Sequence, residues 1–550
     1  MRLGIDIGGT HTDGALVNNE QVLNTVKLTT NNNKLSQTIL NTGQQLIKNY
    51  DPQEIEQITL STTLATNTIV KNDYQKTALL LIPGPGLTQN WADFSTTNIS
   101  GYINHRGQEV QAIDKTEVIS AVNKLLDSGV KKIGVCGKFA TRNPEHELKI
   151  KKIIKNNFPE LETISLSHQL TPKLNFPRRQ VTTYFNRALY ESQQNFIANI
   201  KSGFRELNLN CPIYLLKADG GTMNLKEAKQ IPIETINSGP SASIMGILAL
   251  TKPQQNTLGI DIGGTTTDIS LFINQEPLFK PDGITINNYN SSIRGLYNKS
   301  IGCGGDSVVQ IKDGKLTIGP QRKGAAAALG GPAPTPTDAL VVLDKLQLGD
   351  RNKAYNSLKT LSEKLDLSPQ QIAEKIISRF SENIETEVRK IINELQSQPV
   401  YTINELLSDY TLDLHHLVGI GGPAEALIPE LANRLNLSYT IPEQSKIANA
   451  IGAALARKTT QCTLYADTDQ GYYHILQFSQ QQEIDSNFTL EDAQKTAVKQ
   501  LAEQNYPQDN IEITNSQSFN LVRGFRTTGK ILEVTAQVKP DLYKVALSCH

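Results

Sequence analysis

The sequence lacks long apolar runs, and no stretch approaches the roughly 20 residues that a helix needs to cross a bilayer. Near the start, Asp6 interrupts the apolar run Leu3–Ile7 and a Gly-Gly pair follows at once, which is not typical of a secretory signal. We therefore expect a cytoplasmic protein that does not act in a membrane.

Cysteine is scarce, and the five cysteines lie far apart without forming a Cys-x-x-Cys pair. They are Cys136, Cys211, Cys303, Cys462 and Cys549. Such spacing argues for a reducing compartment, and against a disulfide framework or a structural zinc site.

The chain also lacks an excess of charge of either sign, with 54 basic and 54 acidic residues. Because no global field results, we expect no nucleic-acid partner and no attraction to anionic membranes. A phosphate site remains compatible with this balance, since backbone amides supply positive potential locally. The length of 550 residues predicts three or four structural units, at about 150 residues each.

What the sequence does contain is an internal repeat. Residues 3–17, LGIDIGGTHTDGALV, and residues 258–272, LGIDIGGTTTDISLF, are identical at 11 of 15 positions, at an offset of 255. This spacing is too large for a solenoid repeat and indicates a duplicated domain. In each copy an apolar run predicts a buried strand, the Gly-Gly pair a tight turn, and a second apolar run the returning strand of a hairpin.

The turn in each copy has the features of a phosphate site. Backbone N–H groups that no side chain shields, with threonine hydroxyls beside them, form a nest for an anion. The residues expected to contact phosphates are Gly8, Gly9, Thr10, Thr12, Gly263, Gly264, Thr265 and Thr267. A short glycine turn can also simply close a hairpin, but two near-identical copies favour nucleotide binding.

Four acids flank the two turns: Asp6, Asp13, Asp261 and Asp268. Carboxylates repel phosphate oxygens, so we interpret all four as catalytic groups around a phosphate-bound Mg²⁺ and its water molecules, since hard oxygen ligands suit this ion. Asp6 and Asp261, which occupy the same position in the two copies, are the predicted metal ligands. The predicted cofactors are ATP and Mg²⁺.

A third glycine motif lies towards the end of the second repeat unit. The apolar run 417–420 leads into Gly421 and Gly422 and then into a predicted amphipathic helix over 426–435. A strand, a glycine pair and a helix in this order favour contact with the adenosine part of the nucleotide. The following segment, 449–454, predicts a small-residue helix, and tight helix packing explains that segment equally well.

These motifs, with several others, occur in the order found in a known family. The others are Ser61–Thr63, Thr66–Thr68, Ser238–Ala242, Ile301–Ser307, Pro336–Ala339 and Ala448–Ala454. Together they resemble the hydantoinase/oxoprolinase family, in particular its ATP-binding A-type subunit, over about residues 1–457. The resemblance implies an ATP- and Mg²⁺-dependent enzyme that opens a small cyclic amide such as a hydantoin, a lactam or 5-oxoproline, or a relative that activates bicarbonate to carboxylate a ketone.

The repeat and the resemblance together imply an α/β fold with two duplicated actin-like halves, of the sugar-kinase and ribonuclease H-like class, around a nucleotide cleft. We place the first half, with an inserted α/β segment, at residues 1–250 and the second at 251–457. Residues 458–550, where strands alternate around one helix, predict a small α+β C-terminal domain. Because the hydrolytic half of the A-type family usually resides in a B-type subunit, we expect a hetero-oligomer; a homodimer is also compatible.

The glycine-rich turn at 302–306 is expected to contact the nucleotide. The residues concerned are Gly302, Gly304, Gly305 and Asp306. The family often has glycine where Asp306 stands and a small apolar residue where Cys303 stands, and segments 319–332 and 408–413 also depart from its pattern. Cys303 has no identifiable histidine partner, so we expect a packing residue whose pKa Asp306 raises if the two are close.

Several other side chains suggest chemistry and also have simpler interpretations. Asp338 lies in a loop that is expected to face the nucleotide. His146 and Glu147 form either an acid/base pair or the favourable first turn of a helix. Arg106 and Arg179 either hold an anion or lie in solvent.

Helices are expected over 116–128, begun by Thr116, over 181–207 and through 341–397. Other functions on the same fold also remain open. These are a small-molecule kinase, an ATP-dependent carboxylase that forms carboxyphosphate, and a chaperone-like or filament-forming nucleotide switch that is not an enzyme on small molecules.

Overall fold

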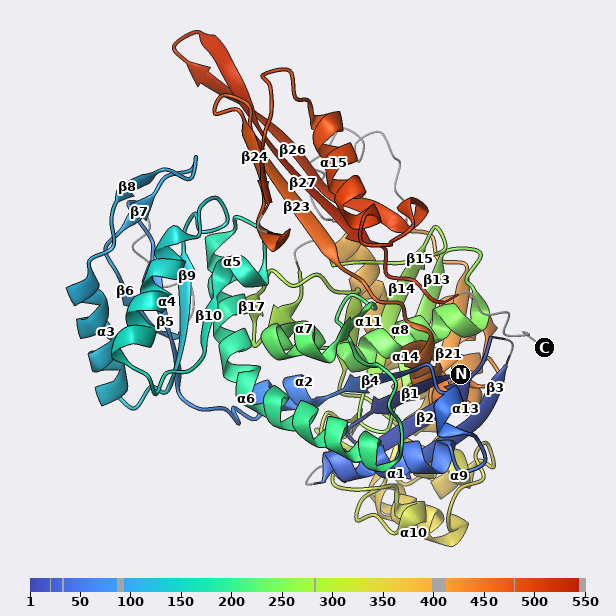
Figure 1. Ribbon diagram of the computed structural model, residues 1–550. Helices are drawn as coiled ribbons and strands as arrows, with labels where there is room; N and C mark the ends of the chain where they lie inside the picture. The colour runs from blue at the N-terminus through green and yellow to red at the C-terminus, as the bar shows by residue number, and fades with distance from the viewer. Residues whose placement is uncertain are drawn as a thin grey trace.

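The computed structural model describes residues 1–19, 21–31, 34–86, 93–280, 283–397, 412–478 and 480–543. These residues form a mixed α/β protein whose C-terminal strands project from the body (Figure 1). None of the described helices is both long enough and apolar enough to cross a bilayer.

The first repeat opens a six-stranded sheet with the order β12-β11-β4-β1-β2-β3. Its strands are β1 (Arg2–Ile7), β2 (His11–Val17), β3 (Val22–Thr29), β4 (Gln57–Thr62), β11 (Ile213–Leu216) and β12 (Thr222–Asn224). Strands β1, β4 and β11 run parallel, whereas β2 and β3 add an antiparallel meander. Strand β1 is buried from Leu3 to Ile7, as expected for an apolar run in the middle of a sheet.

The second repeat opens an equivalent sheet with the order β15-β14-β13-β21-β22, and β18 pairs with β14. Its strands are β13 (Thr257–Ile262), β14 (Thr267–Ile273), β15 (Glu276–Pro277), β18 (Asn298–Ile301), β21 (His416–Ile420) and β22 (Ser438–Thr440). Both hairpins have the same register, in which Asp6 lies opposite Asp13 and Asp261 opposite Asp268. The strand–turn–strand unit predicted for each copy is confirmed.

Two small-residue helices, α8 (Ser238–Thr251) and α14 (Ala448–Leu455), pack against each other and against both sheets. Their backbones approach so closely that a Cβ at Gly246 would overlap the Ala448 carbonyl, and a Cβ at Gly4 would overlap the Ala450 carbonyl. The close helix packing that 449–454 suggested is therefore confirmed. Asn449 is a polar residue in this junction.

The segment inserted between β4 and β11 carries a four-stranded parallel sheet with the order β10-β9-β5-β6. Its main elements are β5 (Thr77–Ile82), β6 (Ser95–Asn98), β9 (Lys132–Gly137), β10 (Ile164–Leu166), α3 (Lys115–Asp127), α4 (Glu145–Asn157), α5 (Ser167–Leu170) and α6 (Phe176–Glu206). The expected cap of α3 was wrong, because the Asp114 side chain accepts from the Thr116 N–H (2.8 Å). Helix α6 also begins earlier than predicted, with Asn175 as its cap.

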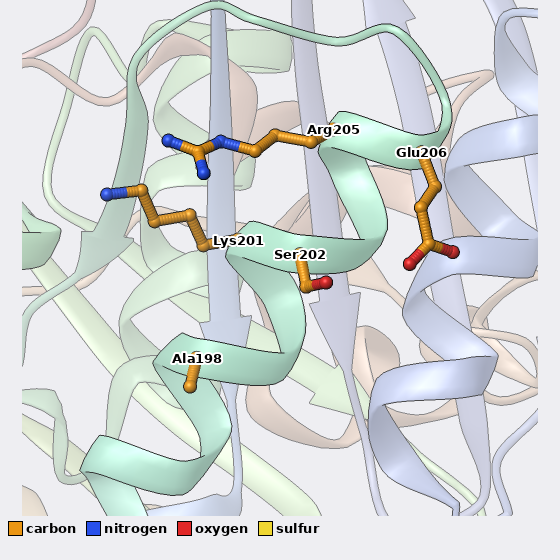
Figure 2. A pocket seen from close by; sticks show the side chains of 5 residues that line it. All are labelled: Ala198, Lys201, Ser202, Arg205 and Glu206. Atoms are coloured by element: carbon orange, nitrogen blue, oxygen red, sulfur yellow. The ribbon is translucent and has the colours of Figure 1, made fainter.

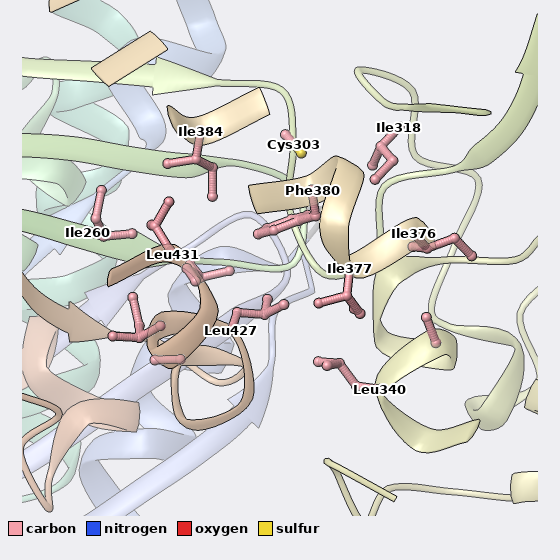
Figure 3. Packing of buried hydrophobic residues seen from close by; sticks show 14 of the residues in the cluster. Ile260, Cys303, Ile318, Leu340, Ile376, Ile377, Phe380, Ile384, Leu427 and Leu431 are labelled. Atoms are coloured by element: carbon pink, nitrogen blue, oxygen red, sulfur yellow. The ribbon is translucent and has the colours of Figure 1, made fainter. Parts of the chain in front are cut away.

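Helices also cover the second sheet: α9 (Pro336–Val342), α10 (Arg351–Leu365), α11 (Pro369–Gln396) and α13 (Ala424–Leu435). The prediction of helix through 341–397 was wrong at 343–350, where a turn separates α9 from α10 and the Asp350 side chain caps α10. Figure 3 shows the shared core, in which Ile260 of β13, Phe380 of α11 and Leu427 of α13 belong to one buried cluster.

The C-terminal residues form the expected strands around one helix. The elements are β23 (Gln461–Asp467), β24 (Tyr472–Ile475), β25 (Gln480–Glu483), α15 (Leu490–Ala502), β26 (Ile511–Arg523) and β27 (Arg526–Val538). Their order is β25-β24-β23-β27-β26, and the tip of the β26–β27 hairpin extends past the other strands (Figure 1).

Smaller elements complete the described chain. They are α1 (Leu35–Leu46), α2 (Leu64–Val70), α7 (Leu225–Gln230), β7 (Tyr102–Ile103), β8 (Glu109–Gln111), β16 (Thr285–Ile286), β17 (Tyr289–Asn290), β19 (Val309–Lys312) and β20 (Lys315–Ile318). Cys549 and most of the 408–413 loop lie outside the described residues.

Candidate nucleotide site

Each repeat makes its turn directly after its first strand. The Gly8 N–H donates to the His11 carbonyl (2.9 Å), and the Gly263 N–H donates in the same way to the Thr266 carbonyl (2.9 Å). None of the four glycines of the two turns has a positive φ, so glycine serves there by lacking a side chain. A Cβ at Gly9 would meet no atom within 4 Å, which leaves that side of the turn open.

The two turns border one site. The Thr10 Oγ1 atom lies 3.8 Å from the position that a Cβ on Gly264 would take. The Asn449 Nδ2 atom lies 3.4 Å from Asp6 Oδ2 and 3.3 Å from Asp261 Oδ2, and donates to both. One amide thus joins the equivalent acids of the two repeats, although they are 255 residues apart.

Burial changes the acidity of these carboxyl groups. Loss of water around Asp6, which is 5% exposed, raises its pKa from 3.8 to about 7. The same effect raises the pKa of Asp268 to about 6 and also raises that of Asp261. The site therefore holds acids that take up protons near neutral pH, and a bound cation would favour their charged form.

Asp13 and Asp268 occupy equivalent positions but have different partners. The Asp13 carboxylate forms an ion pair with Lys27 (2.8 Å), whereas Asp268 accepts from the Asn298 amide (3.2 Å). The two copies therefore differ chemically, because one acid is compensated by a cation and the other by a neutral donor. The catalytic role of the four acids stays a prediction.

Two of the four predicted threonine donors are used inside the protein. The Thr12 hydroxyl hydrogen-bonds that of Thr30 (2.9 Å), and the Thr267 hydroxyl donates to the Cys303 carbonyl (2.6 Å). Both threonines are 0% exposed. The prediction that they contact phosphate is corrected for this reason, and Thr10 and Thr265 remain as candidate donors.

The glycine-rich turn at 302–306 hydrogen-bonds to the backbone of the second repeat turn. The Gly305 N–H donates to the Gly263 carbonyl (2.9 Å), and the Asp306 N–H donates to the Gly264 carbonyl (2.6 Å). The Gly304 N–H is taken by Ser307 Oγ (2.8 Å). The expected nucleotide contact of these three amides is corrected, since the protein already uses them.

Gly302, the first residue of this turn, packs closely against Pro320. A Cβ added at Gly302 would lie 2.5 Å from the Pro320 Cβ atom. The expected contact of Gly302 with the nucleotide stays a prediction.

The third glycine motif lies against the second repeat. Gly421 has φ +98°, and a Cβ there would lie 2.8 Å from Asp261 Oδ1. Gly422 is exposed, and a Cβ there would meet nothing within 4 Å. Gly421 therefore serves the backbone turn beside Asp261, whereas Gly422 is open to a ligand.

Comparisons with known proteins bear on this arrangement. Residues 2–158 match the family model of the hydantoinase/oxoprolinase N-terminal region, and residues 179–461 match that of hydantoinase/oxoprolinase. The chain belongs to the hydantoinase/oxoprolinase family. The sequence resemblance is thereby confirmed.

Relatives within the hydantoinase/oxoprolinase family include the caprolactamase subunit alpha of Pseudomonas jessenii, 24% identical over 87% of this chain and 74% of the relative. The acetophenone carboxylase gamma subunit of Aromatoleum aromaticum is 25% identical over 62% of this chain and 53% of the relative. The 5-oxoprolinase of Saccharomyces cerevisiae is 25% identical, and the match spans 31% of its length. Several curated relatives are thus much longer than the region they share with this chain.

Two solved structures share the fold. The nucleotide-free structure of acetone carboxylase aligns with a TM-score of 0.72 at 16% identity, over 99% of this chain and 88% of that chain. The ATP-dependent caprolactamase from Pseudomonas jessenii aligns with a TM-score of 0.72 at 20% identity, over 100% of this chain and 88% of that chain. The mixed α/β fold is therefore the one found in these proteins.

The residues of this hydantoinase/oxoprolinase chain fit a nucleotide-bound Mg²⁺. Asp6 Oδ1 and Ser61 Oγ are buried and have no hydrogen-bond partner within the described residues. No group of three or more His, Cys, Asp or Glu side chains in that part of the chain could hold a metal ion by itself. Mg²⁺ commonly uses one or two carboxylates together with phosphate oxygens and water, so Asp6 and Asp261 suit an ion that arrives with a nucleotide.

Sequence reasoning missed several residues that the fold brings to the site. They are Lys27, Ser243, Arg322 and, as a site residue, Asn449. Asn449 could have been recognised from the sequence, because it is the one amide in an otherwise apolar helix. Lys27 and Arg322 could not have been recognised from the sequence. The pairing of β2 with β3 brings Lys27 to the site, and the path of the chain after β20 brings Arg322 there.

Cys303 lies in the apolar core rather than at the open side of its turn (Figure 3). It is 4% exposed, and burial raises the pKa of its thiol to about 11. Its role as a packing residue is consistent with the prediction, but the expected cause was wrong, because loss of water and not Asp306 raises the pKa.

The expectation that Asp338 faces the nucleotide was wrong. Its carboxylate accepts from the backbone N–H groups of Ala327 (3.0 Å), Ala328 (2.7 Å) and Thr335 (2.9 Å), and it is 0% exposed. The acid therefore joins two turns before helix α9 instead of facing a ligand.

The acids and bases of the inserted segment also serve the fold. Glu147 lies in the first turn of α4, as predicted, and this interpretation is confirmed. It is 0% exposed and also accepts from Ser167 (2.5 Å) and His168 (2.6 Å). Arg106 forms ion pairs with Asp467 (2.9 Å) at the end of β23 and with Asp469 (2.8 Å) in the turn that follows it. These contacts tie the inserted segment to the C-terminal domain.

The hollow shown in Figure 2 belongs to a different part of the molecule. It has a volume of about 410 Å³ and is lined by Ala198, Lys201, Ser202, Arg205 and Glu206. All five residues come from α6, so the hollow is a depression along one helix, and it shares no residue with the two repeat turns.

Proposed function

We propose that this chain is the ATP-binding subunit of an ATP- and Mg²⁺-dependent enzyme that phosphorylates a small cyclic amide for ring opening. The observation that carries the proposal is the bridge from Asn449 to Asp6 and Asp261. It joins two copies of one open glycine turn at a single site, which is the arrangement that a chain of phosphates needs. Relatives named caprolactamase and 5-oxoprolinase support a cyclic amide as the substrate class.

We further propose that the two sheets are the halves of a duplicated actin-like ATPase, with boundaries at 1–250, 251–457 and 458–550. The identical hairpin registers and the parallel pairs β1–β4 and β13–β21 support this division. Nucleotides in open α/β sheets lie beyond the carboxyl ends of parallel strands. Both repeat turns are at such ends.

In the proposed reaction the amide oxygen attacks the γ-phosphorus, the bond from that phosphorus to the ADP oxygen breaks, and ADP leaves with the bonding electrons. The product is an imidyl phosphate, whose carbon is electrophilic and whose oxygen has become a good leaving group. Water then adds to that carbon, and the C–N bond breaks as the nitrogen takes a proton, which opens the ring and leaves an acyl phosphate. A second water attacks the acyl carbon, and phosphate leaves as the carboxylate forms. ATP is consumed because an unactivated amide is stable.

The protein's part is to position groups and to neutralise charge, which is how most phosphoryl transfer is catalysed. Amides of the two turns other than those of Gly8 and Gly263, which donate within the protein, would hold phosphate oxygens together with the hydroxyls of Thr10 and Thr265. Asp6 and Asp261 would hold Mg²⁺, which supplies positive charge to the phosphates when bound. Asn449 keeps these two carboxylates at a fixed distance from each other.

A partner subunit is part of the proposal. Relatives are named as the alpha subunit of caprolactamase and the gamma subunit of acetophenone carboxylase. We propose that a B-type subunit carries out the hydrolytic half of the reaction, and that the partner and this chain form a hetero-oligomer.

ADP release from the purified chain, with and without the co-expressed partner, tests the function. We expect a lactam, a hydantoin or 5-oxoproline to stimulate ADP release in wild type and not in Asp261→Ala. A linear amide of similar size is the matched control. Stimulation by a peptide or by polymerisation, with no response to any cyclic amide, would refute the proposal and favour a nucleotide switch.

A carboxylase is the second candidate, because one relative is an acetophenone carboxylase subunit. In that reaction bicarbonate oxygen would attack the γ-phosphorus in the same site and give carboxyphosphate. ADP release that depends on both bicarbonate and a ketone would identify this reaction. ADP release that responds to a cyclic amide without bicarbonate would exclude it.

A further inference from the structure

One ion pair lies beside the second repeat turn and has no part in the function proposed so far. Arg322 Nη2 lies 3.1 Å from Asp306 Oδ2, and the Arg322 side chain is 26% exposed. The Asp306 N–H donates to the Gly264 carbonyl, and its Oδ2 atom lies 2.8 Å from the position of a Cβ on Gly264. Asp306 therefore holds the guanidinium beside the second repeat turn.

The same pair also reaches the first turn. Asp306, which holds Arg322, lies beside Gly264 of the second turn, and Gly264 in turn approaches the first turn. The Thr10 hydroxyl of that turn lies close to Gly264. The guanidinium thus stands where the two turns approach each other.

The Arg322 guanidinium has an N–H donor that the described residues leave without a partner. A guanidinium has five N–H donors in a planar fork, and the Nε of Arg322 is buried without a hydrogen-bond partner in the described part of the chain. Lys27, a second cation near the turns, is occupied by Asp13 and by the Lys446 carbonyl (3.3 Å). Arg322 is therefore the cation better able to donate to a phosphate.

We infer that Arg322, held by Asp306, determines nucleotide specificity by contacting the terminal phosphate of ATP. The inference rests on the proposed function. The adenosine is proposed to contact Gly422 in the second half, so the phosphate that reaches the first turn is the outermost one. Held by Asp306 beside Gly264, where Thr10 of the first turn approaches, Arg322 is in position to bind that phosphate and not those nearer the adenosine.

Binding measurements with Mg²⁺ and either ADP or a non-hydrolysable ATP analogue test this without relying on activity. Arg322→Ala should lower affinity for the analogue about 10- to 100-fold, since a hydrogen bond to a charged group is lost, and should lower affinity for ADP less than about 3-fold. Arg322→Lys should retain part of the discrimination, because the charge remains while the fork is lost. Lys323→Ala is the matched control, because it removes one positive charge from the exposed neighbouring residue and should leave the ratio unchanged.

The outcomes separate this inference from the function on which it rests. If wild type binds neither nucleotide, the proposed function itself fails. If wild type binds both and Arg322→Ala lowers the two affinities equally, Arg322 is structural and the inference is overturned. The thermal midpoint without nucleotide is recorded for each variant, and Arg322→Gln, which keeps the side-chain stem, replaces Arg322→Ala if that variant does not fold.

Discussion

Gly421 and Gly422 are adjacent, yet the structure predicts that alanine at Gly421 destabilises the protein and that alanine at Gly422 does not. At Gly421 the backbone has φ +98°, and an added Cβ would lie 2.8 Å from Asp261 Oδ1 and nearer still to the Ile262 carbonyl. The backbone strain for an L-residue costs about 1–2 kcal/mol, and overpacking costs about 1–3 kcal/mol. Gly421→Ala should therefore destabilise the second half by about 2–5 kcal/mol.

Thermal unfolding measures this effect directly. For a unit of this size, about 1 kcal/mol shifts the midpoint by about 2–4 °C, so Gly421→Ala should lower it by roughly 5–15 °C. Gly422→Ala should leave it nearly unchanged, because its Cβ would meet nothing within 4 Å. Equal midpoints for the two variants would refute the packing argument.

Nucleotide affinity tests whether this motif also contacts the nucleotide, apart from its effect on stability. Gly422→Val places a branched side chain on the open side of the turn, so it should weaken ATP binding more than it changes turnover at saturating ATP. Unchanged affinity in that variant would mean that the motif only ends strand β21 (His416–Ile420).

Three further outcomes follow from the same geometry. Asp6→Ala or Asp261→Ala should abolish ATPase activity while the variants stay folded, through loss of several kcal/mol of transition-state stabilisation; normal turnover in either variant would remove that acid from the site. Burial raises the pKa of Asp6 from 3.8 to about 7, so between these pH values the folded protein holds a proton that the unfolded chain releases. The free energy of unfolding without Mg²⁺ should therefore fall by up to ~4 kcal/mol as pH rises from 4 to 7. Thermal melting at several pH values should show a smaller decline for Asp6→Asn. Cys303→Ala should keep most of the ATPase activity, and the thiol, with a pKa of about 11, should react slowly with iodoacetamide at pH 7; rapid labelling that ATP prevents would contradict its assignment to the core.

The repeat made the core of the site predictable. Strand–turn–strand depends on neighbouring residues, so the apolar runs and Gly-Gly pairs of 3–17 and 258–272 were sufficient to predict both hairpins. Open turns and flanking acids could also be assigned, because residue types and spacing determine them. The direction of individual hydroxyls could not be predicted, since burial of Thr12 and Thr267 depends on partners 18 and 36 residues away.

Glycine-rich turns were the main source of error. Gly304 and Gly305 have the composition of a ligand loop, yet the Gly305 amide donates to the Gly263 carbonyl of another loop and the Gly304 amide donates to the Ser307 hydroxyl of its own turn. The same composition serves both purposes, because close approach of a backbone requires a missing side chain whether the neighbour is a phosphate or a carbonyl. Helix ends at Asp114 and Asn175 were missed because capping depends on the side-chain geometry of one residue.

The sequence by itself determined the duplicated hairpins, the acids beside each turn, the third glycine motif and the family resemblance, because each depends on residues that are neighbours in the chain. Only the tertiary structure decided which distant groups meet. Packing of the small-residue helix 448–455 places Asn449 against Asp6 and Asp261, and the chain path after β20 brings Arg322 to Asp306. Burial likewise set the pKa values of Asp6 and Cys303, since loss of water around a group depends on every element packed over it.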